Sequence, residues 1–244
     1  MTLKLTILII AIIIIFLILW IFFPKKEFEQ ALLTFRFDDG YSSQLNASKI
    51  LEKNNLTATF FCISDSVGES TYMDWDELLN LQKNGFEIGS HTKTHKLMIF
   101  LSEKRHEQEL VESKQEFEKN NITTNVFAYP YGITNPFFAN QVKENYDCAS
   151  NYPFLWGVFN YANTDKYNLN CKEFKTAESF RDALDKAVEK KAWLVACFHR
   201  IGDEDGKYSV SEEEFEKMVL IAKEYQDKEL IKVVDMSEGC SKLK

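Results

Sequence analysis

Two short stretches of the chain carry residues that could hold a metal ion. Asp38 and Asp39 stand side by side before a glycine, and His91 and His95 are four positions apart. On a helix, a His-x-x-x-His spacing puts both imidazoles on one face, and one carboxylate completes a three-ligand site with open positions. Imidazole and carboxylate together suit Zn²⁺ or another borderline divalent ion. Such an ion makes water easier to deprotonate and polarises a carbonyl.

A second carboxylate and a third histidine could move protons beside such a metal. If one of the two adjacent aspartates is a ligand, the other is free to accept a proton, and a distant histidine such as His199 could protonate a leaving group. Each pattern alone is weak, because HxxxH pairs are often surface residues and Asp-Asp-Gly is often a turn. The fourth histidine, His106, stands among Glu and Lys, and we expect it to be a solvated surface residue.

The elements that must position these residues alternate between strand and helix from Ala31 onward. Apolar and β-branched runs predict strands at 31–37, 57–63, 86–89, 125–129, 146–150, 193–198 and 230–234. Helical spacing and capping patterns predict helices over 42–54, 74–85, 102–120, 176–191 and from Ser211 onward. This alternation predicts an α/β fold with a mainly parallel sheet or barrel.

The polar residues follow the predicted strands, at the point where each strand ends. They are Asp38 and Asp39, His91 and His95, Tyr129–Gly132, and His199. In α/β folds the active site lies at the C-terminal ends of the strands. We therefore expect these residues to come together in space.

Four stretches of the sequence, in order, resemble the motifs of the polysaccharide deacetylase family (NodB-homology, carbohydrate esterase family 4). They are Thr34–Gly40 (TFRFDDG), Gly89–His95 (GSHTKTH), Phe127–Gly132 (FAYPYG) and Leu194–His199 (LVACFH). The resemblance extends from about Ala31 to Met236. It implies a distorted (β/α)₇ barrel that removes acetyl groups from N-acetylated sugars of the N-acetylglucosamine type, with one divalent ion. Zn²⁺ is the first expectation, with Co²⁺ and Ni²⁺ as alternatives.

The resemblance also implies a role for each matched side chain. Asp39, His91 and His95 would bind the metal. Asp38 would be the general base that activates water, and His199 would be the acid that protonates the departing amine. These roles agree with the division of labour expected from the residue types alone.

The third motif is expected to contact the substrate. The backbone N–H of Tyr131 would help to hold the oxyanion, with Pro130 and Tyr129 beside it. Many family members carry Arg at the start of this motif to orient the base, whereas this chain has Phe127. Arg36 or Arg200 could supply the missing charge, or each could be a surface residue.

A carboxylate near the acid histidine is also part of the family pattern, and Asp165 is the candidate here, with a loop turn as the alternative. Aromatic residues make up 14% of the chain, and most of them fall in apolar strands or helix stripes typical of a core. Trp75 and Trp156 stand in polar or loop contexts, so they are the rings to consider for stacking on sugars.

The first segment of the chain predicts a membrane anchor. Leu5–Phe23 contains 19 residues without a charge, about the length that crosses a bilayer core. The run is longer than a usual signal-peptide core and lacks an A-x-A site, so we favour an uncleaved helix over a cleaved signal. The expected organisation is an anchor with a short tether over residues 1–30 and a catalytic domain over 31–244, at the cell membrane and facing outward.

Charge and cysteine content limit the remaining classes. With 29 basic and 37 acidic residues the net charge is −8, which argues against a nucleic-acid partner. Cys62 and Cys197 fall in predicted strands and are expected to be packed thiols, whereas Cys148–Cys171 or Cys171–Cys240 could pair outside the cell.

These observations together predict a membrane-anchored, metal-dependent N-deacetylase of a cell-surface polysaccharide. Two alternatives stay open. One is a hydrolase of another non-peptide C–N bond, and the other is an inactive glycan-binding module on the same barrel.

Overall fold

The structure is a computed structural model that describes residue 5 and residues 25–152, 157–202 and 208–244. Strand β1 (Ala31–Phe37) lies at its centre, and all seven residues of that strand are buried. Strand β9 (Trp193–Phe198) runs parallel to β1 along most of its length. Strand β12 (Ile231–Val233) pairs with the first half of β1, and β2 (Thr59–Cys62) pairs with its end. The strand that carries the two aspartates is therefore held on both sides.

The described strands form a curved, barrel-like sheet in the order β6-β9-β1-β2-β3-β4-β5-β7, with β8 also beside β9. Its further members are β3 (Glu87–Ser90), β4 (Val126–Ala128), β5 (Cys148–Asn151), β6 (Phe159–Asn160), β7 (Leu169–Asn170) and β8 (Lys172–Glu173). Apart from β6 against β9, these pairs are parallel. The side chain of Asn160 donates to the Asn170 carbonyl at 2.9 Å and accepts from its N–H at 2.8 Å. This amide links the two ends of the sheet.

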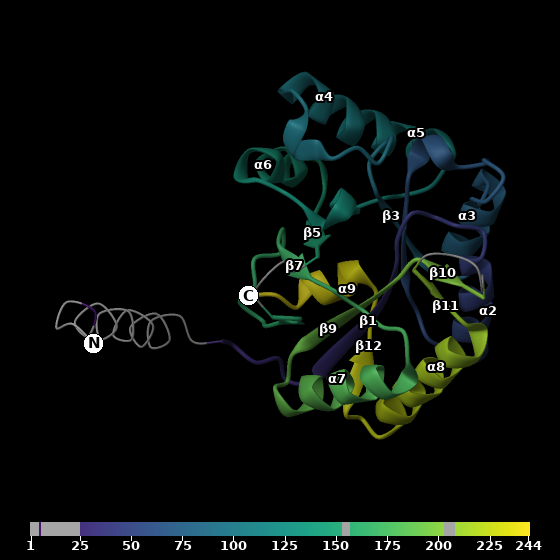
Figure 1. The fold of residues 1–244 in the computed structure, drawn as a ribbon, viewed down its shortest axis with the longest axis vertical. Coiled ribbons are helices and arrows are strands. Elements are labelled where there is room, and N and C mark those ends of the chain that lie inside the picture. Colours follow the sequence, from purple (N-terminus) through teal and green to yellow (C-terminus); the bar gives the residue numbers. More distant parts are fainter. Residues whose placement is uncertain (1–4, 6–24, 153–156, 203–207) are drawn as a thin grey trace.

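Helices surround the strands, as Figure 1 shows. They are α2 (Gln44–Lys53), α3 (Trp75–Lys83), α4 (Glu103–Glu107), α5 (Ser113–Lys119), α6 (Pro136–Asn145), α7 (Ala177–Glu189), α8 (Glu212–Asp227) and α9 (Met236–Ser241). A π-helical turn, η3 (Gln108–Glu112), joins α4 to α5, and the short 3₁₀ segments are η1 (Ser64–Ser66), η2 (Met98–Phe100) and η4 (Pro130–Gly132). Strands β10 (Arg200–Ile201) and β11 (Ser209–Val210) form a separate pair. Strand–helix alternation with a mainly parallel sheet, as predicted, is confirmed.

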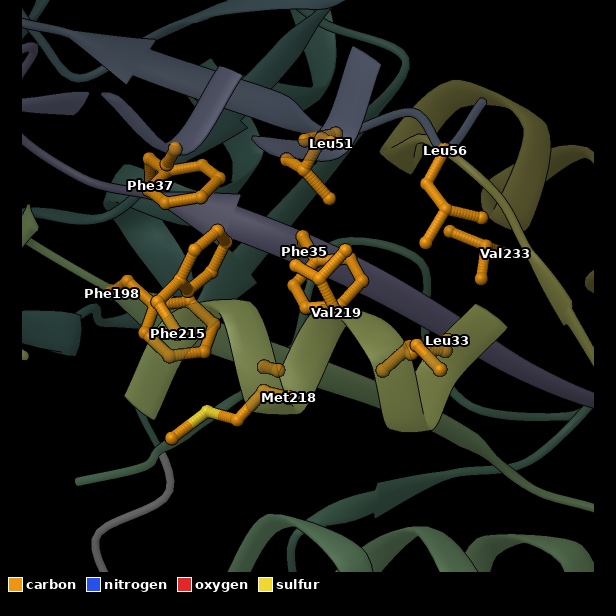
Figure 2. Close-up of a cluster of buried hydrophobic side chains, with 14 of the residues drawn as sticks. Leu33, Phe35, Phe37, Leu51, Leu56, Phe198, Phe215, Met218, Val219 and Val233 are labelled. Carbon is orange, nitrogen blue, oxygen red and sulfur yellow. The ribbon is translucent and has the colours of Figure 1, made fainter. Parts of the chain in front are cut away.

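The two faces of β1 have different surroundings because side chains alternate along a strand. Leu33, Phe35 and Phe37 pack outward against α8, where Phe215 and Val219 meet them (Figure 2). The intervening residues of β1 face the inside of the barrel. The rings of Phe37 and Phe60 stack at 4.7 Å in the outer layer. This apolar layer fixes β1, and hence the residues that follow it.

One sequence prediction about a single residue is wrong, and one helix was not predicted. His106 is 2% exposed rather than solvated, because its ring nitrogens contact the Met98 carbonyl at 2.6 Å and the Gln141 side chain at 3.0 Å. Helix α6 was not predicted, although Asn135 caps it and Pro136 occupies its first turn, both ordinary start signals.

The cysteine pairing also differs from both predicted pairings. Cys148 is bonded to Cys240, which joins β5 to α9. Cys171 is a buried free thiol, together with Cys62 and Cys197 as predicted. The difference arises because β7 and β8 bring Cys171 into the barrel interior, whereas α9 folds back under β5.

The predicted membrane helix over residues 5–23 lies, apart from Leu5, outside the described residues. Among the residues that the structure does describe, none of the helices has the length and apolar character to span a bilayer. The tether that follows is fixed to the domain. The carbonyl of Lys26 accepts from the Ala162 N–H at 2.7 Å, and its own N–H donates to Asn163 at 3.0 Å.

Candidate active site

The turn after β1 presents two carboxylates in different directions. Asp38 is buried, and Asp39 has a left-handed backbone with φ 75°. Gly40 follows with φ 84°, and a Cβ there would lie 3.0 Å from the Cys62 sulfur. Only glycine meets both demands without strain. The Asp-Asp-Gly sequence therefore turns sharply against β2 and separates the two side chains.

The histidine pair lies in a loop after β3 rather than on a helix. His91 is buried and its Nδ1 lies 2.8 Å from the Ala128 carbonyl. A carbonyl only accepts, so Nδ1 carries the proton and Nε2 keeps its lone pair. Burial lowers the pKa of His91 to about 4, which keeps the ring neutral near pH 7. His95 has φ 55°, and this backbone conformation turns its ring back toward His91.

Asp39, His91 and His95 converge on one point. The Nε2 atoms of the two rings are 3.1 Å apart, and each is 3.5 Å from Asp39 Oδ1. Donor atoms about 2.1 Å from a tetrahedral ion lie about 3.4 Å apart. Asp39 Oδ1 is buried and has no hydrogen-bond partner. The donor set, the spacing and the unpartnered oxygen all fit a divalent metal ion.

Asp38 is held by an arginine from the strand that directly precedes it. The Arg36 Nε donates to Oδ1 of Asp38 and Nη2 donates to Oδ2, both at 2.7 Å. The remaining Nη1 donates to Ser150 at 2.7 Å, from β5. Arg36 is 1% exposed, so it is not a surface residue. Burial raises the pKa of Asp38, but the Arg36 guanidinium and His91 hold that pKa well below its usual range.

His199 stands at the end of β9 beside a different carboxylate from the one expected. Its Nδ1 is 3.5 Å from Glu173 Oε1, on β8. Asp165 instead stabilises a turn, in which its side chain accepts from the Tyr167 N–H at 3.0 Å. The amide of Gln44 joins the two strand ends, because it donates to the carbonyls of Asp38 at 2.6 Å and His199 at 2.7 Å. The sequence gives no signal for Gln44.

The third motif places one of its three predicted residues beside the metal ligands. The Tyr131 ring lies 4.6 Å from the His95 ring and is 60% exposed. Tyr129 is wholly buried and donates its hydroxyl to the Tyr167 carbonyl, and Pro130 is also buried. The Tyr129 side chain therefore belongs to a core cluster that also contains Phe127. Phe127 packs in an apolar layer against the helices, away from Asp38.

Arg200, Trp75 and Trp156 are the other polar and aromatic residues that the sequence suggested for the site. Arg200 lies over the Tyr41 ring at 3.9 Å from its centroid. Trp75 packs edge-on against Phe117 at 5.5 Å and belongs to the core, while Trp156 lies outside the described residues. The exposed rings near the site are tyrosines instead. Tyr152 packs against the backbone of Gly132, beside Tyr131.

The structure combines a barrel-like α/β sheet with an Asp-His-His set at the C-terminal ends of its strands, and comparison with known proteins identifies its family. A family model for polysaccharide deacetylases matches residues 25–146, half of the chain. The chain belongs to the polysaccharide deacetylase family. The matched range contains the two aspartates and the histidine pair but ends before His199.

A relative and several solved structures agree with this assignment. The chain is 30% identical to YxkH of Bacillus subtilis, named as a polysaccharide deacetylase, over 113 residues. The match covers 46% of this chain and 40% of YxkH, so the chain spans about two fifths of that relative. A family 4 acetyl xylan esterase from Clostridium thermocellum, solved with a cobalt ion, superposes with a TM-score of 0.60 at 20% identity, covering 85% of this chain and 89% of that one. Peptidoglycan deacetylase PdaC of Bacillus subtilis gives 0.56 at 20% identity, covering 88% and 93%. These similarities show the fold.

Proposed function

We propose that the chain is a metal-dependent N-deacetylase that acts on an N-acetylated polysaccharide of the N-acetylglucosamine type. The observation that carries this proposal is the convergence of Asp39, His91 and His95 on one point beside Asp38. A divalent ion held there would supply Lewis acidity toward the acetyl carbonyl and the attacking water. Two imidazoles and a carboxylate suit Zn²⁺, and Co²⁺ or Ni²⁺ would also fit this donor set.

Asp38 is the residue that we assign as general base. Its pKa lies below the usual range, so it is a carboxylate at neutral pH. Each of its oxygens accepts one hydrogen bond from Arg36. Oδ2 also accepts from the Cys197 thiol at 3.5 Å, whereas Oδ1 keeps a second lone pair. The bidentate contact fixes the plane of the carboxylate, so a water beside the metal ligands meets an oriented acceptor.

His199 is the residue that we assign as general acid. It lies across the site at the end of β9, tied to β1 through Gln44. A departing amine needs a proton when the C–N bond breaks, and an imidazolium can deliver it. Glu173 Oε1, at 3.5 Å from Nδ1, is the carboxylate that lies beside this ring. The Tyr131 N–H is the group proposed to hold the oxyanion.

Exposed tyrosines at the site support a sugar substrate. Tyr131 lies against His95, and Tyr208 lies 5.4 Å from His199. Tyr131, Tyr152 and Tyr208 are 60%, 44% and 47% exposed. A tyrosine ring offers an apolar face with a polar tip, which suits the C–H faces and hydroxyl groups of a glycan.

The location that we propose is the outer face of a membrane. Residues 1–30 would form the anchor and its tether, with residues 5–23 inside the membrane, and residues 31–244 would form the catalytic domain. A Cys148–Cys240 disulfide is typical of oxidising compartments. The tether meets β1 at its first residue, whereas Asp38 follows its last. At about 3.3 Å per residue the site stands roughly 23 Å along the strand from the tether.

The test is acetate release by the full chain, loaded with Zn²⁺ or Co²⁺ in detergent. The panel contains N-acetylglucosamine oligomers, peptidoglycan and small N-acetyl amides, with glycan binding measured in parallel. We expect release from at least one glycan. Release from small amides alone would favour the other C–N hydrolase. Glycan binding without release under any metal would identify an inactive binding module, although retention of both aspartates and the three site histidines argues against it.

A further inference from the structure

The loop that carries the two metal-site histidines is strained and is held from both sides. Thr92 and His95 have φ values of 68° and 55°, a left-handed conformation that is uncommon for residues other than glycine. Such residues persist only where their surroundings fix them. On one side the N–H groups of Ser64 and Asp65 donate to the carbonyls of Thr92 and Lys93, at 3.2 and 3.0 Å. The other side is held by a helix.

That helix changes its winding where it faces the loop. Helices α4 and α5 are continuous through the π-helical turn at Gln108–Glu112, whose flanking residues keep helical dihedrals. A π turn displaces the carbonyls from the usual i to i+4 pattern, and such turns occur frequently at functional sites. Two carbonyls of this turn accept from outside the helix. Glu109 accepts from the Lys93 N–H, and Leu110 accepts from the Tyr146 hydroxyl, both at 3.1 Å.

Glu109 makes three contacts with the loop from this turn. Besides its carbonyl bond to Lys93, its Oε2 accepts from the Thr94 N–H at 2.7 Å, and its Oε1 accepts from the Thr94 hydroxyl. The residue is 5% exposed although it carries a carboxylate. Thr94 directly precedes His95, whose N–H donates to Thr92 at 2.9 Å. The carboxylate thus fixes the Lys93–Thr94 peptide and the Thr94 side chain, directly before His95.

We propose that Glu109 is a positioning residue of the metal centre, which aims His95 at Asp39 and His91 by holding Thr94. The proposal rests on the metal-dependent function proposed above and goes beyond it, because no motif of the sequence contains Glu109. The π turn gives the helix the local geometry that brings both the carboxylate and the carbonyl of one residue to the loop. Outer contacts of this kind commonly change metal affinity by about 10- to 100-fold.

The neighbouring acid in the same turn provides a matched control. Glu112 contacts only the Lys93 ammonium among these loop groups, at 2.7 Å, and its side chain is 43% exposed. Both acids have the same charge and lie in the same turn. Because they differ in the contact with Thr94, a difference between their variants isolates that contact from the general effect of losing a negative charge.

The experiment is Co²⁺ titration of the full chain in detergent, followed by visible absorption and by competition with a chromophoric chelator. We expect Glu109→Gln to weaken Co²⁺ binding about 10- to 100-fold and to change the cobalt spectrum, because the ligand geometry changes. Glu112→Gln should stay within about twofold of wild type. Thr94→Val should weaken Co²⁺ binding less than Glu109→Gln does. Thr94→Ser keeps the hydroxyl and should bind Co²⁺ as the wild type does. The double variant Glu109→Gln/Thr94→Val should lose no more Co²⁺ affinity than Glu109→Gln alone, since both changes break the same contact.

Several outcomes would overturn the proposal. One is a folded Glu109→Gln variant with wild-type Co²⁺ affinity and an unchanged cobalt spectrum. If that variant does not fold, unchanged Co²⁺ affinity in Thr94→Val would overturn the proposal instead. Absence of Co²⁺ binding by wild type would remove the metal centre itself. Acetate release is measured separately. If Glu109→Gln weakens Co²⁺ binding but the wild type releases no acetate, only the proposed function is contradicted. If Glu109→Gln binds Co²⁺ tightly and releases acetate, only the positioning role is contradicted.

Discussion

Arg36, on the inner face of β1, and Asp38, directly after the end of that strand, form a buried bidentate ion pair with both N–O distances at 2.7 Å. Many family members are expected to orient the base with an arginine from the third motif, where this chain has Phe127. Here the guanidinium comes from the strand that directly precedes the base. Ser150 and the Phe61 ring support it from β5 and β2, the ring at 5.2 Å. In this chain the orienting charge is therefore that of Arg36, before the base in the sequence.

The first prediction concerns this pair. Arg36→Lys keeps the charge but loses the two-pronged contact, so we expect turnover to fall about 10- to 100-fold with a folded protein. Arg36→Leu leaves the buried Asp38 without its ion-pair partner, which should cost about 3–5 kcal/mol of unfolding free energy. Turnover and urea unfolding of both variants check this. Arg181→Lys, on the exposed face of α7, is the control. Wild-type turnover in both Arg36 variants would show that the pair has no part in the reaction.

Proton transfer gives the second prediction. Asp38→Asn should keep the metal while losing about 10²–10⁴-fold in turnover, or roughly 3–5 kcal/mol of barrier. His199→Ala should lose a similar factor. The double variant should lose little more than either single one, because both groups serve one proton-transfer sequence. Steady-state kinetics with metal content measured on the same samples tests this. Full additivity would mean that the two groups act in separate steps.

The disulfide leads to the third prediction. The bond closes a sequence separation of 92 residues, and removal of such a link typically costs about 2–5 kcal/mol. We expect Cys148→Ser to lower the unfolding free energy by that amount, and reductant to lower the wild type equally while leaving the variant unchanged. Peptide mapping without reduction should find Cys148 joined to Cys240. A Cys148–Cys171 peptide would contradict the structure.

The fourth prediction is a pH dependence of stability. Burial, together with the Asp235 carboxylate, raises the pKa of Glu87 from 4.5 to about 7, although Thr59 and the N–H groups that begin α9 lower it in part. A raised pKa means that the folded state holds the proton more tightly, so this contribution is present below pH 4.5 and is lost as the pH rises toward 7. The wild type should lose up to roughly 3 kcal/mol over that range. Glu87→Gln should lose less, whereas exposed Glu69→Gln should follow the wild type. Equal slopes for wild type and Glu87→Gln would refute the shift.

The sequence predicts the sheet better than it predicts the contacts inside it. Strands 31–37 and 193–198 are found at their predicted residues, because long apolar runs bounded by polar residues have few other solutions. The i, i+2 spacing of Arg36 and Asp38 also shows that both side chains share one face. It does not show that this face becomes the closed interior of a barrel, so a surface position for Arg36 was an equally valid interpretation.

Contacts that depend on short or distant elements could not be predicted. Glu173 reaches His199 from β8, a strand of two residues that leaves no periodic pattern. Glu109 lies in the predicted helix over 102–120, and the π turn within that helix has no sequence signature. The pairing of Cys148 with Cys240 depends on how α9 folds under the sheet, which is decided by tertiary packing. The motifs therefore indicate the metal ligands, and the supporting residues come only from the structure.

The last prediction is that the full-length chain stays in the membrane fraction through high-salt and alkaline washes. The 19 uncharged residues from Leu5 to Phe23 are the reason, and a chain without residues 1–24 should be soluble. The alternative is a signal peptide cleaved near Glu27. The carbonyl of Lys26 accepts from the Ala162 N–H, and the N–H of Lys26 donates to the Asn163 side chain. Cleavage near Glu27 would therefore require this part of the tether to leave the domain. N-terminal sequencing of protein from membrane and medium separates the two. A mature protein in the medium that begins near Glu27 would exclude the anchor. Full protection of the domain from protease in intact cells would show that the domain faces inward.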